Sequence, residues 1–461
     1  MKDIVVIGAG LTGLTVAFLL RRQGRNVVIL EKEDNVGGTI QTFNEDGYIY
    51  EKGPNTGVIS NADIAELFEM LGLAPAIANE EAEKRLILKN NKWYPLPHGA
   101  LSFLKTPLFT ATDKIKIFFE PFRRKGNNPD ESVAQLAARR IGQSFVDYAV
   151  NPFISGIYAG DPEKLVTRYA LPKLYALEQN YGSFIGGSIK KSREAKPERE
   201  KKATRKVFSV EGGLNKLVKA LKDQIGEENI ICNASDVIVG KKEKGFTIEY
   251  KINNSPKIVE SQIVISTIGS YALPRLLPFI SRVNMDNLTN LNYAKIIQVA
   301  VALKPNALDD KFRSFGGLIP AKENKKLLGV LFPSYCFNNR SPQGCSLLAI
   351  YMGGIKHPEL LELTDMEINE LVQIELTGLF GINSDDIRFT RIFRHQYAIP
   401  QYEKSSGSRL ETIQKLEHEN TGLIIAGNIR DGIGMADRVK QAFTIAAQLK
   451  NQDRPSGCPD T

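Results

Sequence analysis

Three glycines near the N-terminus have the spacing of a phosphate-binding turn. Gly8, Gly10 and Gly13 form G-x-G-x-x-G directly after an apolar segment, residues 4–7, that is expected to be a buried strand, and before an expected helix over residues 14–22. The first glycine permits a tight turn, the second lets backbone approach a pyrophosphate, and the third lets helix and strand pack closely. The amides and the dipole at the start of the helix then favour phosphate.

An acidic residue follows this turn at the distance that dinucleotide binding requires, about 20 residues on. Glu31 ends a second expected strand, residues 27–30, and is placed to accept hydrogen bonds from ribose hydroxyls. Strand, helix and acid make a βαβ unit, so the sequence predicts dinucleotide binding. The residues expected to contact the dinucleotide here are Gly8, Ala9, Gly10, Leu11, Thr12, Gly13, Glu31 and Lys32.

A second glycine pair indicates which dinucleotide binds. Gly37 and Gly38 lie in NVGGTIQTF, which resembles the R-x-G-G-R-x-x-[ST] element of the flavin-dependent amine oxidase superfamily. Thr42 fits the last position of that element, whereas Asn35 and Thr39 replace its two arginines, so a phosphate contact from an arginine at Thr39 is lost. The resemblance implies FAD rather than NAD.

A Gly-Pro turn follows in YEKGPNTG, residues 50–57. Two interpretations stand: a backbone that lies along the isoalloxazine of a flavin, or an ordinary surface turn. The residues assigned to the cofactor in this turn and in the preceding element are Gly38, Thr39, Gly53, Pro54, Asn55 and Thr56.

Length and composition restrict the function classes. The 461 residues, 42% hydrophobic and 24% charged, indicate a globular protein of two or three domains. The four cysteines have no C-x-x-C spacing, so we expect free thiols, a reducing compartment and no metal site. Neither a signal peptide nor an apolar run of about 18 residues is recognised, and we expect the protein in the cytoplasm.

The net charge of +8 is concentrated in one segment. Residues 190–206, KKSREAKPEREKKATRK, hold nine basic and three acidic residues. A solvated mobile loop is one interpretation. Attraction to an anionic membrane surface, at roughly 1 kcal/mol per nearby Lys or Arg, is the other. The segment has no aromatic residues to interleave with its basic ones, so no nucleic-acid partner is expected.

An apolar stripe lies in TDKIKIFFEPF. Ile115, Phe118, Phe119 and Phe122 fall at i, i+3, i+4 and i+7 of an expected helix, among basic residues. The stripe predicts either a buried core helix or an interfacial helix that dips into lipid.

The sequence offers few side chains for acid–base or thiol chemistry. It has only four histidines, His98, His357, His395 and His418, and no redox-active cysteine pair. A flavin protein with this composition is an improbable thiol reductase, and histidine-based catalysis is not favoured. Hydride removal by the flavin itself remains.

The central segment NPFISGIYAGDPEKL, residues 151–165, followed by LEQNYGSFIGGSIK, residues 177–190, resembles the signature of the flavin-dependent protoporphyrinogen/coproporphyrinogen oxidases of haem synthesis. The likeness runs along nearly the whole chain, through KRLILKNNKWYPLP, VEGGLNKLV and GLIIAGNIRDGIGMADRVKQA. It implies FAD, oxygen and a porphyrinogen, a macrocycle whose bridging methylenes give up hydride readily. The protein must then mainly position a carbon under the flavin and exclude side reactions.

The resemblance also assigns substrate residues. A backbone carbonyl at Gly156 would orient or accept a pyrrole proton, unless this stretch is only a packed loop under a helix. Arg85 would hold a propionate, which a planar guanidinium binds in a two-pronged fork, unless it is simply solvated. Leu318 and Tyr351 would sandwich pyrrole rings, unless they are core residues.

The order of the elements predicts an α/β chain, α+β overall. It has a discontinuous Rossmann-like FAD-binding domain, a substrate domain with a mixed sheet, and a helical domain that associates with membranes. The expected FAD-binding parts are residues 1–85, 207–269 and 418–450; the helical and substrate domains are residues 86–206 and 270–417, and residues 451–461 form a tail. Strands over residues 296–303, 327–332 and 346–351 would roof the active site.

The superfamily resemblance places further cofactor contacts in the later FAD-binding parts. These are Val237, Asn428, Ile433, Gly434 and Met435. Met435 starts an expected helix, residues 435–449, whose N-terminus should point at the N1/C2 edge of the flavin. Arg430 and Arg438 depart from what most relatives have, so the local electrostatics are expected to differ.

The sequence therefore predicts an oxygen-dependent six-electron oxidation of protoporphyrinogen IX, with coproporphyrinogen III as the alternative substrate. More remote are a flavin amine oxidase or carotenoid desaturase, and a non-enzymatic prenyl-binding carrier of the same fold. The resemblance further implies peripheral contact with the inner face of the cell membrane, a homodimer, and ferrochelatase as a partner.

Overall fold

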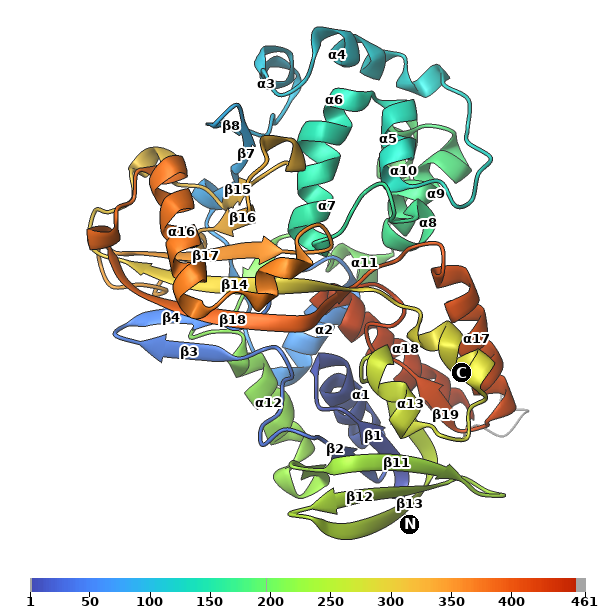
Figure 1. Ribbon diagram of the computed structural model, residues 1–461. Coiled ribbons are helices and arrows are strands. Elements are labelled where there is room, and N and C mark those ends of the chain that lie inside the picture. The colour runs from blue at the N-terminus through green and yellow to red at the C-terminus, as the bar shows by residue number, and fades with distance from the viewer. Residues whose placement is uncertain (1, 196, 453–461) are drawn as a thin grey trace.

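The computed structural model describes residues 2–195 and 197–452 (Figure 1). Its two largest sheets have seven strands each. In Figure 1 the first sheet lies at the bottom, the second crosses the middle, and the helices from α3 to α10 lie at the top.

The first sheet contains the expected βαβ unit. β1 (Lys2–Ile7) and β2 (Val27–Leu30) are parallel neighbours connected by α1 (Leu11–Arg22). All four residues of β2 are buried, as expected of a parallel strand covered on both faces. The helix begins three residues before the expected start, because Gly10 already takes the extended conformation of an N-cap.

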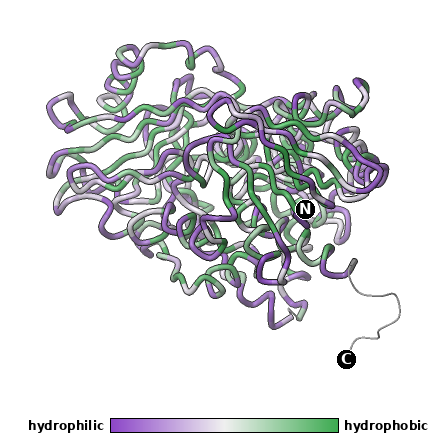
Figure 2. Tube along the Cα trace, turned by 90° about the horizontal axis from the view of Figure 1, so that it is seen from below, coloured by the Kyte–Doolittle hydropathy of each residue, from purple (hydrophilic) through white to green (hydrophobic). Residues whose placement is uncertain are grey.

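The other strands of the first sheet come from distant parts of the chain. The order is β10-β2-β1-β13-β12-β11, and β19 also pairs with β13. These strands are β10 (Ile230–Ile231), β11 (Ser235–Lys241), β12 (Phe246–Ile252), β13 (Ser255–Ser266) and β19 (Leu423–Ile425). β1, β13 and β19 are parallel, so their carboxyl ends meet at one edge. Figure 2 shows hydrophobic residues, in green, gathered in the chain segments beside the N-terminus.

Helices cover both faces of this sheet. On one face lie α1, α2 (Ala62–Leu71), α12 (Asn215–Ile225) and α18 (Met435–Gln452). On the other face lie α13 (Leu273–Leu276), α14 (Arg282–Thr289) and α17 (Ser406–Glu419). A small sheet of β5 (Gly57–Val58), β9 (Val207–Ser209) and β6 (Ala76–Ile77) lies beside α2.

The second sheet is mixed, in the order β18-β14-β17-β16-β15-β7-β8. Its strands are β7 (Arg85–Lys89), β8 (Lys92–Pro95), β14 (Tyr293–Leu303), β15 (Gly316–Leu318), β16 (Leu327–Leu331), β17 (Ser346–Gly353) and β18 (Ile387–Pro400). One face packs against α16 (Asp365–Phe380). The other packs against the hairpin of β3 (Thr42–Glu45) and β4 (Tyr48–Glu51), which follows the glycine-rich elements. Residues 85–95 join this sheet, whereas the sequence analysis gave residues 86–206 to the helical domain.

The helical region is built on buried charges. Arg140 at the end of α5 (Val133–Arg140) is fully buried and pairs with Glu120, whose carboxylate also accepts hydrogen bonds from the Ser183 hydroxyl and the Phe184 amide. These bonds from backbone and hydroxyl, with the nearby arginine, lower the pKa of Glu120 despite its burial. They fix α9 (Pro172–Tyr181) and α10 (Phe184–Arg193) against the rest of the region.

The basic segment is largely exposed, as one interpretation of the sequence predicted, but parts of it are helical and not loop. Its described residues complete α10 and form α11 (Glu198–Lys201); Lys196 lies outside the described residues. Arg199 pairs with Asp63 and Glu66 of α2, which fixes the segment to the first domain. The sequence does not reveal this pairing, because the partners lie more than 130 residues apart in the chain.

The apolar stripe is exposed, so the core-helix interpretation is wrong. Phe118 ends α4 (Ala111–Phe118) and is 64% exposed, and Phe122 beyond it is 84% exposed. Leu101 and Leu104 of the neighbouring α3 (Ala100–Lys105) are also exposed. In the described part of the chain, no helix combines the length and apolar character needed to cross a membrane.

Candidate active site

The glycine turn is closed by the acid that the sequence predicted. Glu31 is buried, and its carboxylate accepts hydrogen bonds from the amides of Ala9, at 2.6 Å, and Glu33, at 3.0 Å. Gly8 has a φ of +99°, a conformation that favours glycine. A Cβ on Gly13 would lie 2.0 Å from the Gly8 carbonyl oxygen, so strand and helix approach as closely as predicted.

The space next to this turn suits a dinucleotide. A Cβ on Gly10 would meet no atom within 4 Å, and one on Gly38 would lie 3.5 Å from the Gly10 Cα. The two predicted glycine elements therefore face one open space. Leu11 and Thr12 are buried in the first turn of α1, whose amides are free for a phosphate.

Lys32 differs from the other predicted contacts. Its side chain is 74% exposed and its ammonium lies 3.1 Å from Glu33, which raises the pKa of Lys32. Its ammonium is therefore engaged at the surface, away from the turn.

The Gly-Pro turn is fixed to the second sheet and is not an ordinary surface turn. The Gly53 amide donates to Gln298 Oε1, at 2.8 Å, and Gln298 Nε2 donates to the Glu51 carbonyl, at 2.8 Å. Asn55 Nδ2 donates to the hydroxyl of Tyr351, at 2.6 Å. Gln298 and Tyr351 are register partners on β14 and β17, so two adjacent strands hold the turn.

The same turn also contacts the second glycine element. A Cβ on Gly53, which has a φ of +129°, would lie 2.4 Å from the Thr39 carbonyl oxygen. Pro54 and Thr56 flank Asn55 and are half-buried. The Gly-Pro turn thus adjoins the second glycine element, which itself lies next to Gly10.

The predicted substrate residues share one face of the second sheet. Leu318 on β15 is level with Ile87 of β7 on one side and with Gly329 of β16 on the other, and Gly329 is level with Tyr351. Arg85 is two residues from Ile87, so its side chain emerges on the same face. The Arg85 guanidinium lies 5.1 Å over the Phe315 ring, which holds it in place without a carboxylate.

The central segment forms a helix, α7 (Asn151–Tyr158), so the packed-loop interpretation is wrong. Pro152 lies in the first turn, where its missing amide hydrogen is not needed. A Cβ on Gly156 would lie 2.4 Å from Leu318 Cδ2, so the absence of a side chain lets the helix contact the sheet. Gly156 lies in the last turn, where carbonyls lack intrahelical partners. The next carbonyls are already bonded: Tyr158 O accepts from Gln401 and Ala159 O from the Ile355 amide.

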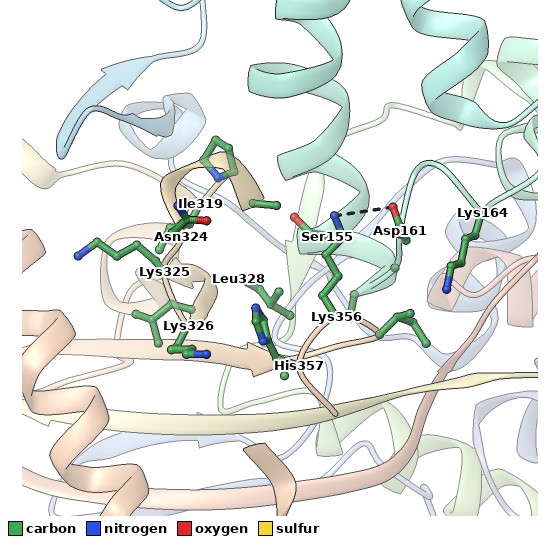
Figure 3. A pocket seen from close by; sticks show the side chains of 17 residues that line it. Ser155, Asp161, Lys164, Ile319, Asn324, Lys325, Lys326, Leu328, Lys356 and His357 are labelled. Atoms are coloured by element: carbon green, nitrogen blue, oxygen red, sulfur yellow. Dashed lines mark ion pairs between the residues drawn. The ribbon is translucent and has the colours of Figure 1, made fainter. Parts of the chain in front are cut away.

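The helix α7 borders a hollow. Ser155 and Ala159 line a hollow of about 600 Å³ on one side, together with the turn after β17 and the loop between β15 and β16 (Figure 3). Phe153 and Ile157 alternate with them, about 200° around the helix, and are exposed on the opposite side. The hollow adjoins the C-terminal end of β15, whereas Arg85 is level with Gly316 at its N-terminal end.

The hollow in Figure 3 is strongly basic. Lys164, Lys325, Lys326 and Lys356 line it, and only Asp161, 3.8 Å from Lys356, opposes them among its lining residues. Ala159 and Leu328 of its lining belong to the same apolar cluster as Tyr351, so the hollow adjoins one of the predicted substrate residues.

The remaining predicted cofactor residues lie at the carboxyl edge of the first sheet or next to it. Val237 packs against the apolar cluster that contains Ile7 and Leu30, the last residues of β1 and β2. Asn428 and Ile433 lie in the loop between β19 and α18, Gly434 is exposed at its end, and Met435 is the buried first residue of α18.

Comparison with known proteins identifies the family. The model of the flavin-containing amine oxidoreductases matches residues 11–447. The chain belongs to this family. It is 27% identical to protoporphyrinogen oxidase 2 of Arabidopsis thaliana, over 96% of this chain and 93% of that protein. It is 25% identical to coproporphyrinogen III oxidase of Bacillus subtilis, over 95% of this chain and 96% of that protein.

Solved structures show the same fold. An Exiguobacterium protein assigned provisionally as a protoporphyrinogen oxidase has a TM-score of 0.81 at 21% identity, covering 98% of this chain and 99% of that one. Reduced UDP-galactopyranose mutase has a TM-score of 0.74 at 15% identity, covering 99% of this chain and 97% of that one. The predicted fold class and flavin cofactor are confirmed, and the open space beside Gly10 and Gly38 fits FAD.

Sequence reasoning missed several residues of the site. Gln298 fixes the Gly-Pro turn from 245 residues away, and Thr267 donates from its hydroxyl to the Ile7 or Gly8 carbonyl at 3.0 Å. Neither carries a motif. Phe153 and Ile157 could have been found, because they lie four residues apart, on either side of Gly156, within the segment that carried the resemblance.

Proposed function

We propose that this protein oxidises protoporphyrinogen IX to protoporphyrin IX with FAD and oxygen. One observation carries the proposal: Gly156, Leu318, Tyr351 and Arg85 border one face, and Tyr351 holds the turn assigned to the flavin. Plant protoporphyrinogen oxidases among the relatives support it, including a mitochondrial protein of Nicotiana tabacum at 29% identity. Coproporphyrinogen III is the second candidate substrate, because the Bacillus subtilis relative acts on it by name.

The residues have distinct tasks in this proposal. Arg85 holds a propionate of the macrocycle through its planar fork. Leu318 and Tyr351, the register partners of Gly329 on its two sides, contact the pyrrole rings from this face. The Gly156 carbonyl orients or accepts a pyrrole proton. Phe153 and Ile157 supply an apolar wall that excludes water.

Bound FAD supplies a hydride acceptor that oxygen can reoxidise. Loss of six electrons from the porphyrinogen takes three such rounds, each releasing one hydrogen peroxide. Between rounds the protein must present different methylene bridges to one position. The macrocycle must therefore rotate in the site, and an apolar site with a single cationic anchor allows this rotation better than a site with several fixed charges.

We further propose that the exposed apolar stripe contacts a membrane surface from the cytoplasmic side. Phe118, Phe119 and Phe122 are exposed and are followed by Arg123 and Arg124; Leu101 and Leu104 of α3 are also exposed, and α3 and α4 are the topmost helices in Figure 1. Apolar side chains with adjacent cations are typical of interfacial helices. The homodimer and the ferrochelatase contact stay predictions.

Aerobic assays on both porphyrinogens test the function. The purified protein should be yellow, and porphyrin fluorescence should appear with three peroxides per porphyrin. A higher kcat/KM for coproporphyrinogen III than for protoporphyrinogen IX would make coproporphyrinogen III the preferred substrate. No turnover of either by yellow protein would refute both, and colourless protein would support the prenyl-binding carrier.

A further inference from the structure

The loop between β19 and α18 lies next to the dinucleotide turn. A Cβ on Gly427 would lie 2.7 Å from the Thr267 carbonyl oxygen, and one on Gly8 would lie 2.9 Å from Thr267 Oγ1. Gly8, Thr267 and Gly427 directly or closely follow the parallel strands β1, β13 and β19. Ligands of such sheets bind outside the carboxyl ends of the strands, so this loop borders the cofactor.

One arginine holds this loop from inside the protein. Arg438, in the first turns of α18, is only 8% exposed. Its Nη2 donates to the carbonyls of Arg430 and Gly432, both at 2.8 Å, and its Nη1 donates to the Gly427 carbonyl and to Gln441 Oε1. Its Nε has no hydrogen-bond partner among the described residues.

The charge of Arg438 is not neutralised by an ion pair. No carboxylate of the described residues lies within 4.0 Å of its guanidinium, and burial lowers the pKa of Arg438. The nearest acids are Asp431, which accepts from Gln441, and Asp437, which accepts from the Gly434 amide. Burying a cation without a counter-charge is unfavourable, so a group that brings negative charge to this place would be stabilised.

Arg430 in the same loop provides the contrast. Its guanidinium lies 3.0 Å from Glu417 and 3.5 Å from Asp431, so its charge is locally balanced. Of the two arginines that distinguish this loop, only Arg438 is both buried and unpaired.

We propose that Arg438 is a positioning residue that raises the reduction potential of the flavin, because it keeps an unneutralised positive charge beneath the loop at the isoalloxazine N1/C2 edge. When hydride from the substrate adds to the flavin N5, two electrons are gained and a negative charge develops at that edge. Charge near the ring nitrogens tunes the cofactor, and a cation in a poorly solvated place acts strongly. The inference rests on flavin binding and not on the identity of the substrate.

The test compares Arg438→Gln, Arg438→Lys and, as the matched control, Arg430→Gln, each as the flavin-loaded full chain. Two properties are measured by absorbance: the midpoint potential, by equilibration with a reference dye, and the dissociation constant of sulfite, which adds at N5 and leaves negative charge at N1. FAD affinity is measured separately by titrating apoprotein.

Arg438→Gln should make reduction at least tenfold less favourable, a fall of about 30 mV or more for a two-electron couple, and should weaken sulfite binding at least tenfold. Arg438→Lys should recover most of both, because it keeps the charge. Arg430→Gln should change each by less than about threefold, since its charge is paired and partly solvated.

An unchanged potential in flavin-loaded Arg438→Gln would overturn the proposal, as would a lower FAD affinity with an unchanged potential, which would assign Arg438 to the pyrophosphate or to the fold alone. If neither Arg438 variant retains flavin, the midpoint potential of the flavin in the wild-type protein tests the proposal instead. A value at or below that of free FAD contradicts the proposal, and a value above it supports the proposal.

Discussion

A side chain at Gly156 should disable the substrate site without disturbing the flavin site. In Gly156→Ala the added Cβ would lie 2.4 Å from Leu318 Cδ2, whereas ordinary contacts begin near 3.4 Å. Helix and leucine must therefore separate by about 1 Å. Leu318 Cδ2 is the free end of a side chain beside Gly329, so the leucine must shift on the face that carries the predicted substrate residues.

The size of the effect follows from this displacement. Overpacking a well-packed contact destabilises by about 1–3 kcal/mol, which should appear as a lower melting temperature. A misplacement of about 1 Å in a substrate-positioning element lowers turnover by about 10²-fold. The ratio of flavin to protein absorbance should stay at the wild-type value, since no predicted flavin contact touches Gly156.

Two further variants make this prediction specific. Gly156→Ala combined with Leu318→Ala should recover part of the lost kcat, because the truncated leucine makes room for the methyl group. Gly378 of α16 is the control: a Cβ there would meet nothing within 4 Å, so Gly378→Ala should stabilise the helix slightly and leave the kinetics unchanged. Wild-type kcat and KM in Gly156→Ala would refute the reasoning, as would a double variant no better than the single one.

Three other predictions follow from the site and from the exposed stripe. Gly10→Val should fold but purify colourless, because its side chain fills the open space beside the turn. Gly13→Ala should instead lower the melting temperature, because its Cβ would lie 2.0 Å from a backbone oxygen. Full flavin content in Gly10→Val would contradict the placement of the cofactor beside this turn. Arg85→Ala should raise KM about ten- to a hundredfold with flavin content unchanged, and Arg85→Lys should recover only part, in steady-state assays; unchanged kinetics would remove Arg85 from the site. Anionic liposomes should carry the protein upward in flotation at low salt, less so at high salt and in Phe118→Ser/Phe122→Ser; equal flotation of that variant would exclude the stripe.

The sequence predicted best what depends on local spacing. The βαβ unit, its buried acid and the helix after Gly434 follow from glycine positions and apolar periodicity, and the structure has them within a few residues. The start of α1 was missed by three residues, because the turn glycine itself caps the helix.

Contacts between distant segments were not predictable. Gln298 lies in an apolar strand, and nothing in that strand indicates that its amide holds a turn 245 residues away. The same holds for Arg438, whose burial among carbonyls depends on how the loop folds over it. The stripe of Phe118 and Phe122 had the periodicity of a core helix, and only the absence of a covering element distinguishes the two cases.

Anaerobic mixing of the yellow protein with protoporphyrinogen IX tests the central claim most directly. Without oxygen each flavin can accept only one hydride, so the flavin absorbance should bleach at a rate no slower than aerobic turnover, and one porphyrin should form for every three flavins reduced. A flavin that stays oxidised with protoporphyrinogen IX and with coproporphyrinogen III, in protein that a chemical reductant still bleaches, would contradict the account.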